Sequence, residues 1–208
     1  MRTLILILFT ILASCAHGPQ GMDAFLNCPV NKIYNGDPYE LDAVVLIKRG
    51  NMRCTGVFIS NRAVLTAGHC VGPEPMTVDD NPVIVTFVHP EVDLAVIHVL
   101  LPVNDITPLA ISPFSPMEGE PIAIVGRGSR NDNKFGDLFG GMNTIFYVDT
   151  DHFMYLSIPN ICDGDSGGPT LDNKCRIMGI HSSGSRRCGY LGIDIRTDIY
   201  KDWIELLK

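Results

Sequence analysis

The stretch CDGDSGGP, residues 162–169, places Ser166 after an aspartate and before two glycines. A serine hydroxyl is a weak nucleophile near neutral pH, and it attacks a carbonyl carbon only when a base lies within hydrogen-bond reach. Two earlier stretches supply candidates: LTAGHC (65–70) contains His69, and DLAVI (93–97) begins with Asp93. An imidazole can accept the serine proton, and a carboxylate can orient that imidazole and stabilise its cation. The three stretches together indicate that distant parts of the chain meet at a nucleophilic serine.

These motifs, in the order His, Asp, Ser, resemble the chymotrypsin/trypsin family of serine proteases, from about Ile33 to the C-terminus. The resemblance implies an all-β fold of two packed six-stranded antiparallel β-barrels with a short C-terminal helix. It implies a serine endopeptidase in which Ser166 is the nucleophile, His69 the general base and Asp93 its partner. The backbone N–H groups of Gly164 and Ser166 would form the oxyanion hole. Two alternatives stay open, a catalytically silent binding protein on the same fold and a serine esterase.

The apolar pattern independently favours an all-β fold. Short runs rich in Val and Ile are separated by Gly, Pro, Asn and Asp, and they are too short for helices. They include DAVVLIK (42–48), TGVFIS (55–60), VIVTFV (83–88), LAVIHV (94–99), PIAIVG (121–126), FMYLSI (153–158) and CRIMGIHS (175–182). The tail TDIYKDWIELLK has apolar residues at helical spacing and predicts a terminal helix capped by Thr197 or Asp198. The stretch from 128 to 141 is predicted to be a surface loop.

The first residues predict export. One Arg is followed by an apolar run that is too short to span a bilayer as a helix, so residues 1–14 are predicted to be a signal peptide. The following LASC resembles the bacterial lipobox, which would make Cys15 a lipidated anchor. Residues 15–32 would then form a lipid-anchor and pro-segment, and residues 33–208 the protease domain. The alternative is cleavage after Ala16 and plain secretion. The protein is predicted to be exported, either as an outer-membrane or cell-surface lipoprotein or as a secreted protein.

Composition excludes several other classes of protein. The chain has 208 residues and a net charge of −7, and its closest approach to a basic run is Arg186-Arg187. We therefore expect no nucleic-acid partner, because binding phosphates needs clustered Lys and Arg. The cysteine spacings fit no usual zinc pattern, so no metal and no cofactor are expected. The expected partners are protein or peptide substrates and an activating protease, with membrane contact through the lipid anchor only.

The segment CPVNKIYNGD (28–37) contains a candidate activation site. In the family that the chain resembles, a cut after a basic residue frees an N-terminus, commonly Ile-Val-Gly-Gly, whose amine pairs with the Asp before the catalytic serine. Here these residues would be Lys32, Ile33 and Asp165, although Tyr34 and Asn35 depart from the usual sequence. A buried carboxylate is costly unless a cation meets it, and an α-amine is such a cation. The alternative is a permanent surface loop.

Six cysteines remain once Cys15 is set aside, an even number that suggests disulfides in an exported chain. The resemblance implies a Cys54–Cys70 bridge beside the His loop and a Cys162–Cys188 bridge beside the substrate pocket. This leaves Cys28 and Cys175, a pair without a family counterpart. Such a bridge would keep the activated enzyme tied to its N-terminal segment.

The resemblance also suggests residues of the primary specificity pocket. Asn160 stands six residues before Ser166, where trypsin-like enzymes have the Asp that selects Lys or Arg. The pocket walls would be Ile161, Ser182, Ser183, Gly184 and Gly192, with the two glycines leaving room for a large side chain. His181 stands where glutamate-specific relatives have a histidine, whereas Asp194 near the pocket base would attract a basic side chain or pair with His181. We expect an acidic preference; the alternatives are a basic preference and a His181 that is a core residue with no role in selection.

Overall fold

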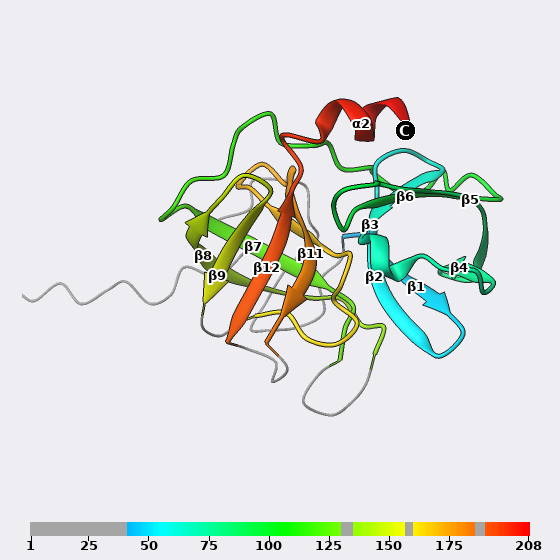
Figure 1. Ribbon diagram of the computed structural model, residues 1–208. Helices are drawn as coiled ribbons and strands as arrows, with labels where there is room; N and C mark the ends of the chain where they lie inside the picture. Colours follow the sequence, from blue (N-terminus) through cyan, green and yellow to red (C-terminus); the bar gives the residue numbers. More distant parts are fainter. Residues whose placement is uncertain (1–40, 130–134, 157–159, 186–189) are drawn as a thin grey trace, which may run out of the picture.

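A computed structural model describes residues 41–129, 135–156, 160–185 and 190–208 of the chain. The strands form two closed antiparallel barrels of six strands each, packed side by side (Figure 1). This confirms the predicted all-β, two-barrel fold with a short C-terminal helix.

The first barrel has the strand order β1-β2-β3-β6-β5-β4. Its strands are β1 (Val44–Arg49), β2 (Met52–Phe58), β3 (Ala63–Thr66), β4 (Met76–Val78), β5 (Asn81–Val88) and β6 (Ala95–Val99). Strands β3 and β6 are fully or almost fully buried, which explains why they are continuous apolar runs. They pair with Thr66 opposite Ala95, so the segments that follow β3 and precede β6 lie at the same end of the barrel.

The second barrel has the strand order β10-β11-β12-β9-β8-β7. Its strands are β7 (Pro121–Gly126), β8 (Phe139–Val148), β9 (His152–Leu156), β10 (Pro169–Leu171), β11 (Ile177–Gly184) and β12 (Leu191–Arg196). The prediction that residues 128–141 form one surface loop is wrong at its end, because Phe139, Gly140 and Gly141 already pair with β7. The loop that carries Ser166 runs between β9 and β10, on the side of this barrel that faces the first barrel.

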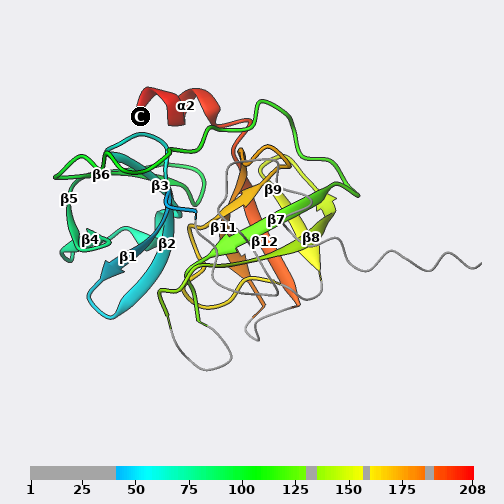
Figure 2. The same ribbon diagram turned by 180° about the vertical axis from the view of Figure 1, so that it is seen from behind.

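The chain ends in the predicted helix, α2 (Lys201–Leu206), which packs against the first barrel (Figure 2). The ring of His89 lies between the rings of Tyr200 and Trp203, and His98 on β6 bonds the carbonyl oxygen of Leu207. The predicted cap is wrong, because the helix begins after Tyr200. Thr197 instead bonds the carbonyl oxygen of Ile177, and Asp198 pairs with Arg196. Within the described ranges, none of the helices has the length and apolar character needed to span a membrane.

Candidate active site

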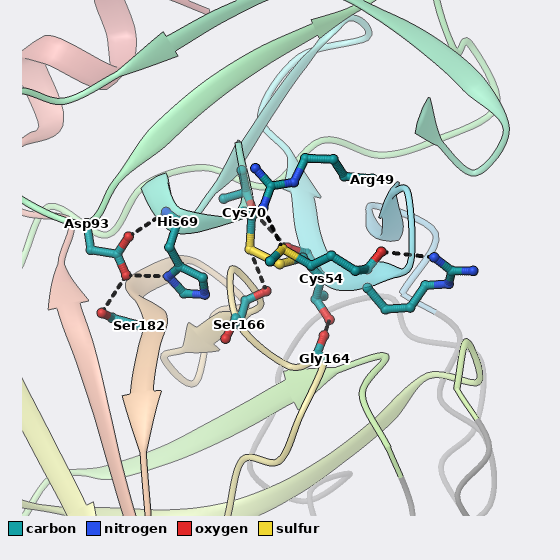
Figure 3. Close-up of a disulfide and its surroundings, with 12 residues drawn as sticks. Arg49, Cys54, His69, Cys70, Asp93, Gly164, Ser166 and Ser182 are labelled. Carbon is teal, nitrogen blue, oxygen red and sulfur yellow. Dashed lines mark hydrogen bonds and ion pairs between the residues drawn. A yellow bond between two sulfur atoms is a disulfide. The ribbon is translucent and has the colours of Figure 1, made fainter. Parts of the chain in front are cut away.

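His69 and Asp93 are in direct contact (Figure 3). His69 lies in a single 3-10 turn, η1 (Gly68–Cys70), which follows β3, and Asp93 lies just before β6. Nδ1 of His69 is 2.8 Å from Oδ2 of Asp93, and the backbone N–H of His69 donates to Oδ1 at 2.8 Å. The pairing of β3 with β6 therefore brings His69 and Asp93 together, and the carboxylate of Asp93 holds both the ring and the backbone of His69.

The same carboxylate has a third partner in the second barrel. The hydroxyl of Ser182 on β11 donates to Oδ2 of Asp93 at 2.6 Å (Figure 3). Burial raises the pKa of Asp93, but the hydrogen bonds from His69 and Ser182 outweigh it and hold the pKa below its usual value. Asp93 is therefore ionised near neutral pH. Ser182 was predicted to be one of the pocket walls, but its side chain bonds Asp93 instead, and no signal in the sequence distinguishes the two roles.

Ser166 shares a cleft of about 350 Å³ with His69. Its carbonyl oxygen accepts a 2.8 Å hydrogen bond from the N–H of Thr55, which fixes the serine loop to the first barrel. Among the hydrogen bonds of the described residues, none joins the Ser166 hydroxyl to the His69 ring. Such contacts are often long before substrate binds.

The loop before Ser166 presents two backbone donors to the cleft. Gly164 has a φ of +92°, and a Cβ there would lie 3.0 Å from Cα of Gly128, so only glycine fits without strain. Gly164 and Ser166 both line the cleft. Within the described part of the chain, neither of their N–H groups donates a hydrogen bond. Two free donors in a cleft suit a developing oxyanion.

Thr55 on β2 anchors this loop through its side chain. Its hydroxyl donates to the carbonyl oxygen of Gly164 at 2.8 Å and accepts from the N–H of Arg127 at 2.9 Å. Thr55 is fully buried between the two barrels. The sequence does not predict this role of Thr55, because nothing near Thr55 in the chain indicates a contact with a loop more than a hundred residues away.

The predicted Cys54–Cys70 disulfide is present and braces the turn that carries His69. Cys162 and Cys175 are also disulfide-bonded. Their predicted partners, Cys188 and Cys28, lie outside the described residues, so these two pairings stay predictions. The donor atoms of Cys54, His69 and Cys70 lie within 4.8 Å of one another. They do not fit a metal ion, because both sulfurs are committed to the disulfide.

Asp165 lies beside a second, smaller cavity of about 110 Å³. Its carboxylate accepts from the N–H of Gly128 at 2.7 Å and from that of Cys162 at 2.8 Å. Burial raises the pKa of Asp165 above its usual value despite these two bonds. The cavity walls include the apolar side chains of Ile124, Phe139 and Ile161. The predicted partner residues Lys32 and Ile33, like Cys15, lie outside the described residues.

His181 lies in the interior of the second barrel. Its Nδ1 is 3.0 Å from Oδ1 of Asp194, and its Nε2 is 3.2 Å from the carbonyl oxygen of Val125. Both neighbours are acceptors, an arrangement that favours a proton on each ring nitrogen. Burial lowers the pKa of His181, but the Asp194 carboxylate outweighs it and raises the pKa above its usual value. Tyr155 and Thr170 also donate to Asp194.

The predicted pocket residues therefore separate into two groups. Three line the cleft that contains Ser166: Ile161, Ser183 and Gly184. Five are not among the described residues that line it: Asn160, His181, Ser182, Gly192 and Asp194. The expectation that His181 meets a substrate carboxylate is wrong for this geometry, because the ring is fully buried and both nitrogens are occupied. The expectation that Gly192 leaves room for a large side chain is also wrong, because the side chains of Tyr155 and Asn160 fill that space, whereas Gly184 lines the cleft.

Comparisons with known proteins identify the family and the fold. A family model described as Trypsin matches residues 32–204. Stejnefibrase-1 of Trimeresurus stejnegeri, named an alpha- and beta-fibrinogenase, is 25% identical over 225 residues, covering 83% of this chain and 86% of the relative.

Two solved structures have the same fold. Neuropsin, a serine protease expressed in the limbic system of mouse brain, has a TM-score of 0.72 at 21% identity, covering 86% of this chain and 98% of its own. Kallikrein-related peptidase 10, in a complex with Zn2+, has a TM-score of 0.68 at 22% identity, covering 80% of this chain and 95% of its own.

Proposed function

Because the chain belongs to the trypsin family, we propose that it is a serine endopeptidase that hydrolyses peptide bonds through Ser166, His69 and Asp93. One observation carries the proposal: Nδ1 of His69 lies 2.8 Å from Asp93, on the wall of the cleft that also contains Ser166. Because Asp93 bonds Nδ1 of His69, the other ring nitrogen, Nε2, is available to a serine hydroxyl.

In the first half of the reaction, Oγ of Ser166 attacks the carbonyl carbon of the scissile bond and passes its proton to Nε2 of His69. Asp93 stabilises the resulting imidazolium. The carbonyl oxygen becomes an oxyanion, which accepts hydrogen bonds from the N–H groups of Gly164 and Ser166. The imidazolium then protonates the leaving amine, the C–N bond breaks, and an acyl-enzyme remains.

In the second half, water replaces the departed amine. His69 accepts a proton from the water while its oxygen attacks the acyl carbon. The tetrahedral oxyanion forms again at the same two donors, and its collapse returns the proton to Ser166 and releases the carboxylic acid. Each turnover consumes one water and leaves the enzyme unchanged, so the chemistry needs no cofactor.

Labelling with a fluorophosphonate tests this proposal, because the reagent reacts with an activated serine. We expect the full chain to be labelled after its activating cleavage, and the Ser166→Ala variant to remain unlabelled. Hydrolysis of peptide amides as well as simple esters would favour the endopeptidase over the esterase alternative. A correctly folded chain that is not labelled would instead be a binding protein on this scaffold.

The second part of the proposal is activation by cleavage after Lys32. The cavity beside Asp165 combines a carboxylate whose pKa is raised by burial with apolar walls, which suit an apolar residue at the new N-terminus. A new α-amine at Ile33 would supply the cation that this carboxylate needs. Because Asp165 precedes Ser166 and bonds the N–H of Cys162, pairing there would order the loop that holds the oxyanion donors.

The third part of the proposal is export with a lipid anchor at Cys15. It rests on the apolar leader and the LASC sequence. Radiolabelled palmitate fed to cells that make the full chain should be incorporated, and the Cys15→Ala variant should lose the label. Incorporation that persists in this variant would contradict the anchor, and an unlabelled protein in the medium would indicate plain secretion.

A further inference from the structure

Two glycines and a tyrosine form a row across three strands of the second barrel. Gly184 on β11 pairs with Gly192 on β12, and Gly192 pairs with Tyr155 on β9. Directly paired residues of antiparallel strands project to the same face of the sheet. The two glycines therefore leave this face of the sheet without side chains beside Tyr155. The side chains that cover the two glycines determine the shape of the substrate pocket.

The ring of Tyr155 fills the space over Gly192. A Cβ at Gly192 would lie 2.3 Å from Cε2 of that ring and 2.6 Å from Oδ1 of Asn160. Tyr155 is fully buried, and its hydroxyl is 3.0 Å from Asp194 and 3.2 Å from His181. The ring is thus held at its far end, and displacing it would leave a buried carboxylate short of a donor. This half of the surface is closed to a substrate.

Gly184 lies against the backbone of Leu191 and the side chain of Ile161. A Cβ at Gly184 would lie 2.8 Å from the carbonyl oxygen of Leu191, 3.3 Å from Cγ1 of Ile161 and 3.4 Å from its Cδ1. Only 9% of Ile161 is exposed, and it lines both the cleft of Ser166 and the cavity beside Asp165. The isoleucine side chain is therefore the partition between the cleft and the polar interior of the barrel.

The polar groups behind this partition are already satisfied by one another. The His181 cation is paired with Asp194, and both side chains are fully buried. Asn160 does not line the cleft; its Oδ1 accepts from the N–H of Ile161. Arg53 and Asp163 also line the cleft, but a long substrate side chain entering beside Ile161 would meet apolar carbon, so a charge at its end would not reach the His181–Asp194 pair behind it.

We propose that the primary pocket is shallow, that it takes small aliphatic side chains such as alanine and valine, and that Ile161 limits its depth. This specificity rests on the proposed function, because it concerns the residue on the amino side of the bond that Ser166 attacks. It also means that the enzyme does not cut its own Lys32-Ile33 bond. Activation then requires a second protease that prefers a basic residue.

The test uses the full chain after its activating cleavage and a series of peptide amides that differ only in the residue before the scissile bond. The series contains Ala, Val, Leu, Phe, Lys and Glu, and rates are normalised to the fraction of protein labelled by a fluorophosphonate. We expect kcat/KM for Ala or Val to exceed that for Phe, Lys and Glu by at least about tenfold, the discrimination that a few buried methylene groups give. Equal or faster cleavage after Phe, Lys or Glu would overturn the inference.

Ile161→Ala tests the role of the partition itself. Removing three carbons should raise kcat/KM for the Leu and Phe substrates at least about tenfold relative to the Ala substrate. Ile59→Ala is the matched control, because Ile59 is also a buried isoleucine but lies in the first barrel; its profile should match that of the unaltered enzyme. An unchanged ranking in labelled Ile161→Ala would overturn the role of Ile161.

The two proposals fail in different ways. If the unaltered chain is neither labelled nor able to hydrolyse any peptide of the series, the proposed function fails and the specificity falls with it. If the chain is labelled and hydrolyses peptides but prefers a large or charged residue, only the specificity fails. Because the unaltered chain alone decides between these results, the test stands even where the Ile161→Ala variant does not fold.

Discussion

The hydroxyl of Thr55 donates a 2.8 Å hydrogen bond to the carbonyl oxygen of Gly164. Thr55 belongs to β2 of the first barrel, whereas Gly164 belongs to the loop of the second barrel that precedes Ser166. The same hydroxyl accepts from the N–H of Arg127, so one buried side chain joins three segments. Because the loop presents the proposed oxyanion donors, its position depends on a residue of the other barrel.

Replacing Thr55 with valine should slow catalysis without blocking substrate binding. The change keeps the shape of the side chain but leaves the carbonyl oxygen of Gly164 and the N–H of Arg127 without this partner. A small displacement of preorganised donors costs about tenfold to a hundredfold in rate, so kcat should fall by that factor while KM changes little. Steady-state kinetics on a peptide amide measures both constants.

Thr197→Val is the matched control for this prediction. The buried hydroxyl of Thr197 also donates a 2.8 Å bond to a backbone carbonyl, that of Ile177, but far along the chain from the Ser166 loop. Both variants should lose stability by about 1 kcal/mol or more, because each leaves a buried carbonyl short of a donor. Equal kcat values in the two variants would show that the Thr55 bond contributes to stability alone.

Ser182→Ala should weaken the enzyme most on the acid side of its pH range. The Ser182 hydroxyl is one of the donors that hold the pKa of Asp93 below its usual value, against the effect of burial. Without it the pKa of Asp93 rises, and the ionised form that orients His69 is lost at a higher pH. Measuring kcat/KM from pH 4 to pH 9 should show the acid limb displaced upwards.

Ser115→Ala provides the comparison for Ser182. The Ser115 hydroxyl donates to the carboxylate of Asp198 at 2.8 Å, a similar bond remote from the cleft. Its pH profile should coincide with that of the unaltered enzyme. An acid limb that moves equally in both variants, or in neither, would contradict the role given to Ser182.

The sequence predicts the parts of the site that short motifs carry. His69 and Asp93 each adjoin a buried apolar strand, and the pairing of β3 with β6 brings them together. The alternation of short apolar runs and turn residues likewise predicts strands rather than helices. These features are local, or depend on one strand pair, so they can be read from a single chain.

The parts that the sequence does not predict depend on register across several strands. Nothing in GIHSSG (179–184) shows that Ser182 faces Asp93 while its neighbour His181 faces the interior. Similarly, Gly192 suggests an open pocket until its pairing places Tyr155 beside it. Such contacts follow from the closure of each barrel and from the packing of one barrel on the other. Local sequence patterns predict neither of these.

His181→Val should destabilise the protein strongly, because it leaves Asp194 as a buried carboxylate without its cation. Breaking a buried ion pair from one side typically costs about 3–5 kcal/mol. Replacing both His181 and Asp194 with valine should recover much of that loss. Guanidinium unfolding of the single and double variants measures the difference, and a double variant no more stable than the single one would contradict the pairing.

The free energy of unfolding of the unaltered protein should depend on pH because of this ion pair. The pKa of His181 is raised by folding, from an ordinary value of 6.5. Its contribution to the free energy of unfolding is therefore complete below that pH and is lost as the pH rises through the higher folded-state pKa. Unfolding curves at several pH values should show this decline in the unaltered protein and not in the double valine variant.

Removing the Cys54–Cys70 disulfide should lower both stability and activity. The bridge spans a sequence separation of 16 and ends beside His69. A loop of this length contributes about 3 kcal/mol through its effect on the unfolded chain. The Cys54→Ala, Cys70→Ala double variant should therefore unfold at a lower guanidinium concentration and should be labelled more slowly by a fluorophosphonate. An unchanged unfolding midpoint would mean that the bridge does not restrict the unfolded state.

Asp165→Asn should separate cleavage of the precursor from its activation. The carboxylate holds the N–H groups of Gly128 and Cys162, and it is the proposed partner of the amine freed at Ile33. An amide cannot pair with that amine, so the cleaved variant should lose activity by about a hundredfold or more, the scale of a lost oxyanion donor. Mass spectrometry of the N-terminus should still find the cut after Lys32.

Asp172→Asn is the control that separates this effect from a general loss of buried charge. Asp172 is buried and accepts bonds from Ser112 and Arg176, at a site that is not part of the cleft. The variant should be less stable, because it loses its ion pair with Arg176, yet once cleaved it should retain most of its kcat. If Asp165→Asn keeps full activity after cleavage, the amine of Ile33 does not order the loop, and the oxyanion donors are in place before the chain is cut.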